Sequence, residues 1–147
     1  MCIRDREHTN FRYSKAEDFT QGQPSFSSID VSFISLSLIL PPLKQILEPD
    51  GEVVALIKPQ FEAGREHVGK HGIVKDPKIH ESVIQKVIQL AVDSGFSPRH
   101  LDFSPITGGE GNIEFLIHLK SVAGTPEVAP EIDVAGTVEK AHRILTA

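Results

Sequence analysis

The sequence predicts an α/β domain built on a mixed sheet. Two short apolar segments, residues 26–31 and 52–57, are typical of buried parallel strands, and an apolar stripe lies between them. A glycine-rich turn at residues 107–111 joins two further strand-like segments, and such a short connection predicts an antiparallel hairpin. The predicted order is therefore strand, helix, strand, loop, helix, antiparallel strand pair, helix.

Length and composition restrict the classes of protein. At 147 residues the chain is expected to form one domain, and 39% hydrophobic with 24% charged residues is an ordinary globular composition. The formal net charge of -5 gives no overall attraction to nucleic acid, so any RNA contact must come from a local patch. The single cysteine, Cys2, excludes an internal disulfide and a cysteine metal cluster, which fits a reducing compartment.

The apolar runs are too short for a membrane span, which needs about 18 or more residues. The most apolar stretch, residues 33–47, is interrupted by Pro41 and Pro42. The N-terminus lacks the apolar region of a secretory signal. We therefore expect a cytoplasmic protein with no membrane partner.

The first half of the chain provides three elements. Residues 1–25 are polar, and the first predicted strand follows them. The stripe over residues 36–47 predicts a helix that either starts or kinks at Pro41 and Pro42. The turn before residue 52 contains Asp-Gly, and it leads directly into the second strand.

The second half begins with a long basic loop, residues 59–76, which we expect to be mobile and functional. Asp76 and Pro77 then open the best helix of the chain as its N-cap and first residue, and Gly95 ends it. The hairpin strands are expected at residues 99–106 and 112–119. A terminal amphipathic helix is expected at residues 131–145.

Polar side chains stand at the ends of three predicted strands: Asp30 and Ser32 on the first, Lys58 after the second and Glu114 near the start of the last. The carboxyl ends of parallel strands open onto a crevice, so we expect the two carboxylates and the lysine to converge there as a proton-handling site. Singly, each residue is weak evidence. A lone Asp30 is more often a helix cap, and Lys58 alone is compatible with a solvated strand end.

Other sites are not supported. The seven histidines lack metal-ligand spacing, since His67 and His71 are four apart in a glycine-rich loop rather than a helix, and we expect no metal. Residues 108–111 precede a strand, whereas a phosphate-binding loop precedes a helix. No Ser-His-Asp or Cys-His signature is present.

Several segments taken together are more specific than their members. They are Ile29-Asp30-Val31-Ser32-Phe33-Ile34-Ser35, Leu40-Pro41, Lys58-Pro59-Gln60-Phe61-Glu62-Ala63-Gly64, Gly69-Lys70-His71-Gly72, Ser104-Pro105-Ile106-Thr107-Gly108 and Gly111-Asn112-Ile113-Glu114-Phe115. This set closely resembles the TlyA (hemolysin A) family of FtsJ-like methyltransferases. Those enzymes use S-adenosylmethionine to methylate 2′-hydroxyls of ribosomal RNA. The resemblance runs from about residue 7 to the end.

The resemblance implies a partial Rossmann-like methyltransferase fold. Residues 26–147 correspond to the C-terminal half of an FtsJ-like methyltransferase domain, with a mixed sheet and flanking helices, and residues 1–25 to a remnant of the first half. The family's S4-type RNA-binding domain and its acidic-glycine loop, which grips the methionine part of the cofactor, have no counterpart before Asp30. We therefore expect an N-terminally truncated enzyme that is inactive alone.

The family has a Lys-Asp-Lys-Glu tetrad, whose last three members fall on Asp30, Lys58 and Glu114 by motif. The resemblance implies that Lys58 is the base, that Asp30 orients it, and that Glu114 positions the hydroxyl or balances charge. The first lysine of the tetrad has no counterpart here, and without it we expect Lys58, beside two carboxylates, to stay protonated and to be a poor base. Asp30, Ser32 and Phe33 are the implied contacts to S-adenosylmethionine.

The expected function is that of a ribosomal RNA (cytidine) 2′-O-methyltransferase. The basic loop is expected to contact RNA phosphates through Arg65, Lys70, His71 and Lys75. The alternative is a non-catalytic RNA- or protein-binding remnant, which would lack affinity for the cofactor. A membrane-lytic role, suggested by the hemolysin name, has no basic amphipathic helix to support it. Self-association through the unpaired edge of the Asp30 strand is also expected.

Overall fold

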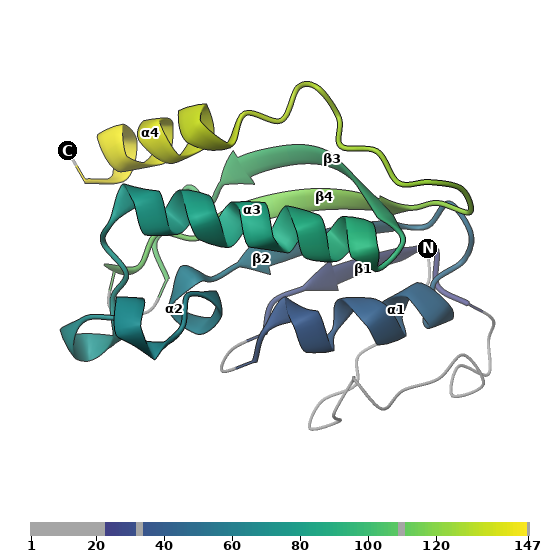
Figure 1. Cartoon of the computed structure of the whole chain (residues 1–147), viewed down its shortest axis with the longest axis horizontal. Coiled ribbons are helices and arrows are strands. Elements are labelled where there is room, and N and C mark those ends of the chain that lie inside the picture. Colours follow the sequence, from purple (N-terminus) through teal and green to yellow (C-terminus); the bar gives the residue numbers. More distant parts are fainter. Residues whose placement is uncertain (1–22, 32–33, 109–110, 147) are drawn as a thin grey trace.

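The computed structural model describes residues 23–31, 34–108 and 111–146. Four strands and four α-helices follow in the order β1 (Phe26–Ile29), α1 (Leu40–Ile46), β2 (Glu52–Ile57), α2 (Pro59–Glu62), α3 (Pro77–Asp93), β3 (Phe96–Phe103), β4 (Phe115–Ser121) and α4 (Val134–Leu145) (Figure 1). Short 3₁₀ turns occupy Leu36–Leu38, Arg65–His67 and Lys70–Gly72. The α/β class and the expected order of elements are confirmed.

The described strands form one mixed sheet in the order β1-β2-β4-β3. β1 runs parallel to β2, with Ile29 opposite Ala55. β4 runs antiparallel to both β2 and β3, with Ile57 opposite Phe115. This register places the carboxyl ends of β1 and β2 beside the amino end of β4. Polar residues that follow or precede these strands therefore share one end of the sheet.

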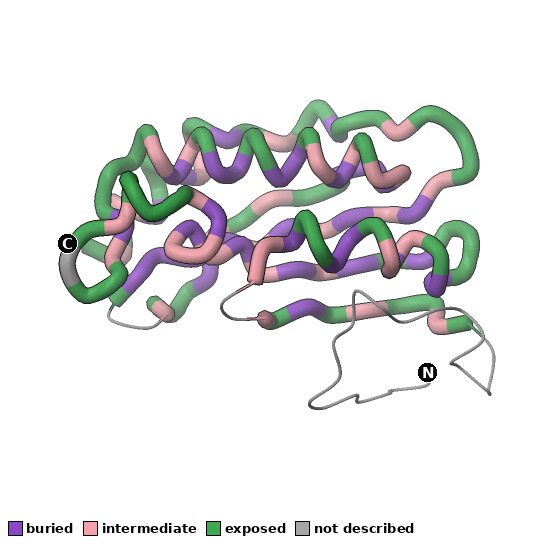
Figure 2. Tube along the Cα trace, turned by 60° about the horizontal axis from the view of Figure 1, so that its bottom comes forward, coloured by how far each residue is buried: buried purple, intermediate pink, exposed green. Residues whose placement is uncertain are grey.

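The core lies between the sheet and its helices. Figures 1 and 2 show α1 and α3 against the same side of the strands, with their buried positions turned toward the sheet. α4 packs on α3 and β3 and joins the same cluster. Fully buried residues of β2, β3, β4, α1, α3 and α4 fill this layer: Leu40, Val53, Ala55, Ile57, Ile84, Phe96, Phe115, Ile117, Leu119 and Ala141. Among the described helices, none is long and apolar enough to span a membrane.

Local sequence signals account for the helix starts. α1 begins at Leu40 with Pro41 and Pro42 in its first turn, so the prolines start the helix rather than kink it. Proline needs no hydrogen-bonded main-chain N–H there. Asp76 caps α3 by accepting a hydrogen bond from the Lys78 N–H, as expected, and Asp133 caps α4 in the same way through Gly136.

Several boundaries differ from expectation: β1, for example, ends at Ile29 rather than at residue 31, and α4 begins at Val134 rather than at residue 131. The segment 59–76 is not a continuous loop, since it contains α2 and two 3₁₀ turns. β3 starts at Phe96 and passes through Pro98 with an irregularity before His100, which is how the strand accommodates a residue without a main-chain donor. β4 starts at Phe115 rather than Asn112, and the Asn112 side chain bonds to the neighbouring loop.

Lys44 links α1 by hydrogen bonds to the residue before β3 and to the end of β4. Its Nζ donates hydrogen bonds to the Gly95 carbonyl at 2.9 Å, the Ser121 hydroxyl at 2.7 Å and the Val122 carbonyl at 2.7 Å. The ammonium also lies 5.6 Å from the ring centroid of Phe96. Burial lowers the pKa of Lys44. This cation thus joins α1 to the turn before β3 and to the end of β4.

We predict that Lys44→Met lowers the free energy of unfolding by about 2 kcal/mol, because three acceptors lose a charged donor. Urea unfolding measures the change. The matched control is Lys78→Met, an exposed lysine on α3, for which we expect a change within about 0.5 kcal/mol. Equal losses in the two variants would contradict a structural role for Lys44.

Candidate active site

The first feature of the site is an ion pair between the ends of two parallel strands. Asp30 follows β1 and Lys58 follows β2, so the pairing of these strands brings the two residues together. Lys58 Nζ lies 2.5 Å from Asp30 Oδ1. The Lys58 side chain is 12% exposed and that of Asp30 is 68% exposed. The lysine is therefore held in the protein by a carboxylate that faces outward.

Glu114 approaches the same end of the sheet from the other side of β2. It precedes Phe115, which pairs with Ile57, so the antiparallel register carries Glu114 toward the level of Lys58. Glu114 is 7% exposed. Its Oε2 accepts a hydrogen bond of 3.0 Å from Gln60 Nε2, and Gln60 lies in α2 two residues beyond Lys58.

The glycine-rich turn before β4 leaves room for the Glu114 carboxylate. A Cβ atom on Gly108 would lie 2.0 Å from Glu114 Oε2, a distance that no side chain tolerates. The Gly108 N–H donates to the Asn112 carbonyl at 2.7 Å, which closes the turn. Glycine at position 108 therefore allows the close approach of the Glu114 carboxylate to the turn.

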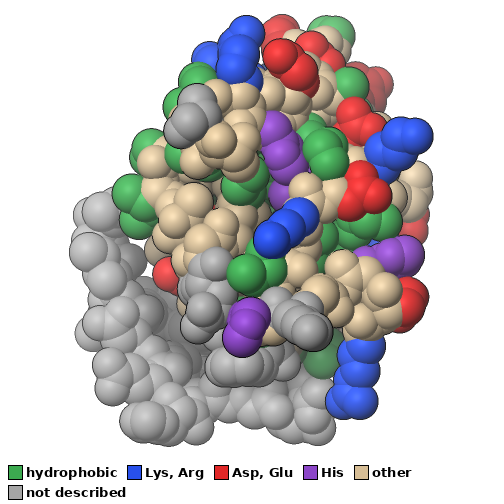
Figure 3. Space-filling view, turned by 90° about the vertical axis from the view of Figure 1, so that its left-hand side faces the viewer, with side chains coloured by type: hydrophobic (Ala, Val, Ile, Leu, Met, Phe, Trp, Pro, Cys, Tyr) green, Lys and Arg blue, Asp and Glu red, His purple; other side chains and the backbone are tan. Residues whose placement is uncertain are grey.

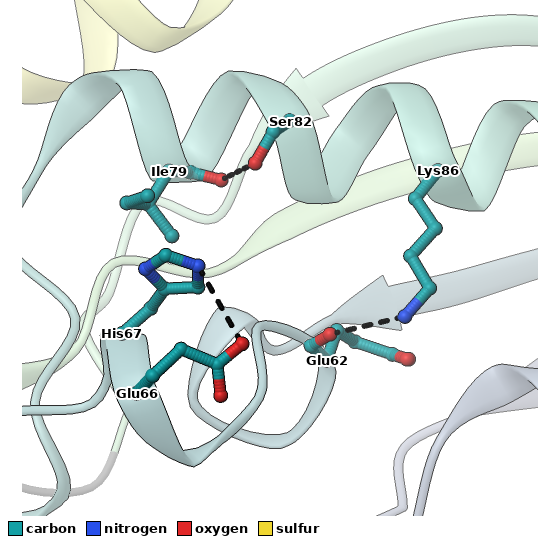
Figure 4. A network of polar contacts seen from close by, with 6 residues as sticks. All are labelled: Glu62, Glu66, His67, Ile79, Ser82 and Lys86. Atoms are coloured by element: carbon teal, nitrogen blue, oxygen red, sulfur yellow. Dashed lines mark hydrogen bonds and ion pairs between the residues drawn. The ribbon is translucent and has the colours of Figure 1, made fainter.

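α2 is held in place by a buried carboxylate that sequence reasoning missed. Glu62 accepts hydrogen bonds from the Ser35 hydroxyl at 2.5 Å and from the Leu36 N–H at 2.9 Å. The Glu62 carbonyl also accepts from Lys86 Nζ of α3 at 3.5 Å (Figure 4). These contacts fix the segment after β2 against the segment after β1. Within the sequence, only the position of Glu62 in the Lys58–Gly64 motif pointed to it.

The basic segment after α2 is exposed at Arg65, His71 and Lys75. A cavity of about 370 Å³ lies in it, lined by His67, Gly69, His71, Ile73 and Lys75. In Figure 3, which views this end of the molecule, cationic and histidine side chains are interspersed with acidic ones. Glu66 contributes to this mixture, since its Oε1 lies 3.7 Å from His67 Nε2 (Figure 4).

A histidine pair with one buried member, His80, contacts this segment through the Val74 carbonyl. His80 of α3 is fully buried, and its Nε2 donates to the Val74 carbonyl at 2.9 Å. Its Nδ1 is then the acceptor for His142 Nε2 of α4, at 2.8 Å. Burial lowers the pKa of both His80 and His142. The negative charge of Asp76 raises both pKa values and so opposes part of each shift. The histidine pair joins α3, α4 and the basic segment.

The expected residues are thus placed as follows. Asp30, Lys58 and Glu114 share one end of the sheet, and Arg65, His71 and Lys75 share one segment beyond α2. Ser32 and Phe33, the expected cofactor contacts, and the Lys70 side chain lie outside the described residues. In the described part of the chain, no three His, Cys, Asp or Glu side chains are grouped to hold a metal ion.

The family match and the matches to individual proteins point to the same family. Residues 2–121 match the family described as FtsJ-like methyltransferase. Over 141 residues, 95% of the chain, it is 53% identical to YqxC of Bacillus subtilis (strain 168), which is named as an rRNA methyltransferase. Over 140 residues it is 31% identical to the 16S/23S rRNA (cytidine-2′-O)-methyltransferase TlyA of Mycobacterium tuberculosis (strain CDC 1551 / Oshkosh), again covering 95% of the chain.

A solved structure from Streptococcus thermophilus, described as a hemolysin, matches 94% of the chain with a TM-score of 0.90 and 55% identity. In each of these three cases the chain covers 50% of the other protein. The chain therefore spans about half the length of the relatives it matches.

The histidine pair predicts how stability depends on pH. Because burial lowers the pKa of His80, the unfolded chain takes up a proton at a higher pH than the folded chain. The free energy of unfolding should fall as the pH drops below about 6.5, by at most about 1.4 kcal/mol per pH unit for this group. Urea unfolding at about seven pH values between pH 8 and pH 5 measures the slope of the free energy of unfolding against pH.

His80→Gln should flatten this slope, and the exposed His67→Gln is the matched control that should retain it. An unchanged slope in His80→Gln would exclude His80 as the responsible group.

Proposed function

Because the chain belongs to the FtsJ-like methyltransferase family, we propose that it forms the substrate side of an S-adenosylmethionine-dependent rRNA (cytidine-2′-O)-methyltransferase acting in the cytoplasm. The observation that carries the proposal is the Asp30–Lys58 ion pair at the carboxyl ends of two parallel strands, with Glu114 at the same end. In open α/β sheets such strand ends form the binding crevice.

The site also suits the cofactor class. Asp30 presents a largely exposed carboxylate at a parallel strand end, and a carboxylate accepts hydrogen bonds from amino and hydroxyl groups such as those of a nucleoside. We propose that Asp30, Ser32 and Phe33 contact S-adenosylmethionine. When bound, the cofactor supplies an electrophilic methyl group on a sulfonium.

The residues of the chain would then prepare the ribose. Removal of the proton from the 2′-hydroxyl requires a base within hydrogen-bond reach, and we propose Lys58 for that role. Asp30 orients Lys58 through the ion pair. Glu114, which is fixed by Gln60 and by the close approach of Gly108, positions the hydroxyl. Alignment of the reacting groups is worth several kcal/mol of the barrier.

The RNA side of the proposal rests on local charge. With a net charge of -5 the chain as a whole repels RNA, so the exposed Arg65, His71 and Lys75, together with Lys70, would contact phosphates locally. Contacts to phosphates position an RNA without reading its sequence. They would place the target ribose near Lys58 and Glu114.

The test is cofactor binding and methyl transfer, measured on this chain and on a chain extended upstream to the length of its relatives. For the 147-residue chain we expect at best millimolar affinity for S-adenosylmethionine, about -4 kcal/mol, and negligible transfer. Only two parallel strand ends face the crevice in the described part of the chain. Calorimetry measures the affinity.

In the extended chain, Lys58→Met and Glu114→Gln should each reduce transfer of a labelled methyl group to rRNA by about 100-fold or more. Lys140→Met on the exposed face of α4 is the matched control. If the extended chain neither binds the cofactor nor methylates rRNA, the methyltransferase proposal fails and the non-catalytic binding role stands. Micromolar binding by the 147-residue chain would contradict the expectation of weak binding only.

The edge of the sheet gives a separate prediction about partners. In the described part of the chain, β1 pairs with β2 on one side and with no other strand. A free strand edge invites pairing with another chain, so we propose that the protein self-associates through β1. Light scattering at low micromolar concentration should detect dimers or larger species.

Ser28→Lys should reduce this association, since a lysine on an edge strand opposes intermolecular pairing. Ser82→Lys on the exposed surface of α3 is the control. A monomeric parent chain with slow amide exchange at Ile29 would show that the edge is already covered.

A further inference from the structure

The main chain of Val74 is held on both sides by buried side chains of other elements. Its N–H donates to Asn112 Oδ1 at 3.0 Å, and its carbonyl accepts from His80 Nε2 at 2.9 Å. All three residues are buried. Irregular backbone is seldom buried without such partners, because an unpaired polar group costs about 1–3 kcal/mol. We refer to Val74, Asn112 and His80 as the Val74 clamp.

Asn112 uses both ends of its side-chain amide on this segment. Besides accepting from Val74, it donates through Nδ2 to the Gly72 carbonyl at 2.8 Å. Two residues later in the chain comes Glu114, whose carboxylate is at the proposed active site. A single buried amide therefore links the segment 72–74 to the start of β4.

The clamped residues alternate with residues that line the cavity. Gly72 and Val74 are bonded to Asn112, whereas His71, Ile73 and Lys75 line the cavity of about 370 Å³. This volume lies within the range of small-ligand pockets. The clamp consequently fixes one wall of the cavity.

The chemistry of the lining favours an anion. Among the described residues that line the cavity are one lysine and two imidazoles, and none of them is a carboxylate; Glu66 lies outside the lining, with its Oε1 3.7 Å from His67 Nε2. His71 adopts a left-handed backbone conformation, with φ 66° and ψ 14°, which non-glycine residues rarely take. Such strain persists where the surrounding structure enforces it, and it is common at binding sites.

We propose that this cavity takes a phosphate group of bound RNA, and that Asn112 is the positioning residue that fixes the cavity wall relative to Glu114. The inference rests on the proposed function, which supplies RNA as the ligand. A phosphate seated against Lys75 and His71 would set the register of the strand. The Asn112 amide would then transmit that register to the carboxylate that positions the ribose. Misplacement by about 1 Å is enough to cost roughly 100-fold in rate.

The test uses the 147-residue chain, a fluorescently labelled single-stranded cytidine-rich RNA and two readouts. Fluorescence anisotropy measures RNA affinity as a function of salt concentration, and hydrogen exchange measures protection of the Val74 amide. Asn112→Ala removes the side-chain hydrogen bonds to the Val74 N–H and the Gly72 carbonyl. Its matched control is Gln89→Ala, which removes an exposed side-chain amide from α3.

Two further variants change the cavity without touching the clamp. His71→Gly removes an imidazole and also relieves the left-handed backbone, so the fold should be retained. Lys75→Gln removes one charge, with Lys140→Gln as its exposed control. For a single-stranded RNA, the loss of one phosphate contact lowers the slope of log affinity against log salt by about 0.7.

We expect Asn112→Ala to accelerate exchange at Val74 and to weaken RNA binding about tenfold, with Gln89→Ala unchanged in both. His71→Gly and Lys75→Gln should weaken binding while Val74 stays protected, and Lys75→Gln alone should lower the salt slope. Unchanged RNA affinity in His71→Gly and Lys75→Gln, or no RNA binding by the parent chain, would overturn the phosphate site. Faster Val74 exchange in Asn112→Ala with full RNA affinity would overturn the positioning role.

These outcomes are independent of the methyltransferase proposal, which is decided by cofactor binding and methyl transfer in the extended chain. If the 147-residue chain does not bind RNA but the extended chain methylates rRNA, only the proposed phosphate site in the cavity is contradicted.

Discussion

The structure depends on the two-sided pairing of β2. Its main-chain groups bond to parallel β1 on one side and to antiparallel β4 on the other. Because the two neighbours run in opposite directions, the residue that follows β1 and the residue that precedes β4 reach the same end of the sheet. Asp30, Lys58 and Glu114 are distant in sequence, and this pairing alone brings them to one end. A slip of one residue in either register would turn alternate side chains to the opposite face.

Outside the sheet, single polar side chains hold irregular backbone in place. Lys44 satisfies acceptors near the start of β3 and the end of β4, Glu62 bonds the segment that follows β1, and Asn112 and His80 bond the main chain around Val74. Each replaces water as the partner of groups that burial would otherwise leave unpaired. The loops beside the proposed site are consequently fixed relative to the strands, which is what an aligned transfer reaction requires.

The family and the geometry bear on function at different levels. Membership among FtsJ-like methyltransferases supports the proposed reaction class, while the strand-end ion pair supports the proposed roles of Asp30 and Lys58. Because the net charge is acidic, the proposed RNA contacts are placed in the locally basic segment around His71 and Lys75. Since the chain covers half of its relatives, activity is a property to be measured on the longer protein as well as on this one.

The sequence by itself determined the class of fold, the element order and most helix starts, because alternation, proline and capping residues act locally: Asp76 and Pro77 suffice to begin α3. It also pointed to Asp30, Lys58 and Glu114, through strand ends and family motifs. Only the tertiary structure decided that Gln60 and Glu62 hold the site and that Asn112 leaves the strand to bond the neighbouring loop. Those roles rest on hydrogen bonds between residues 26 to 54 positions apart. Local sequence patterns carry no information about such pairings.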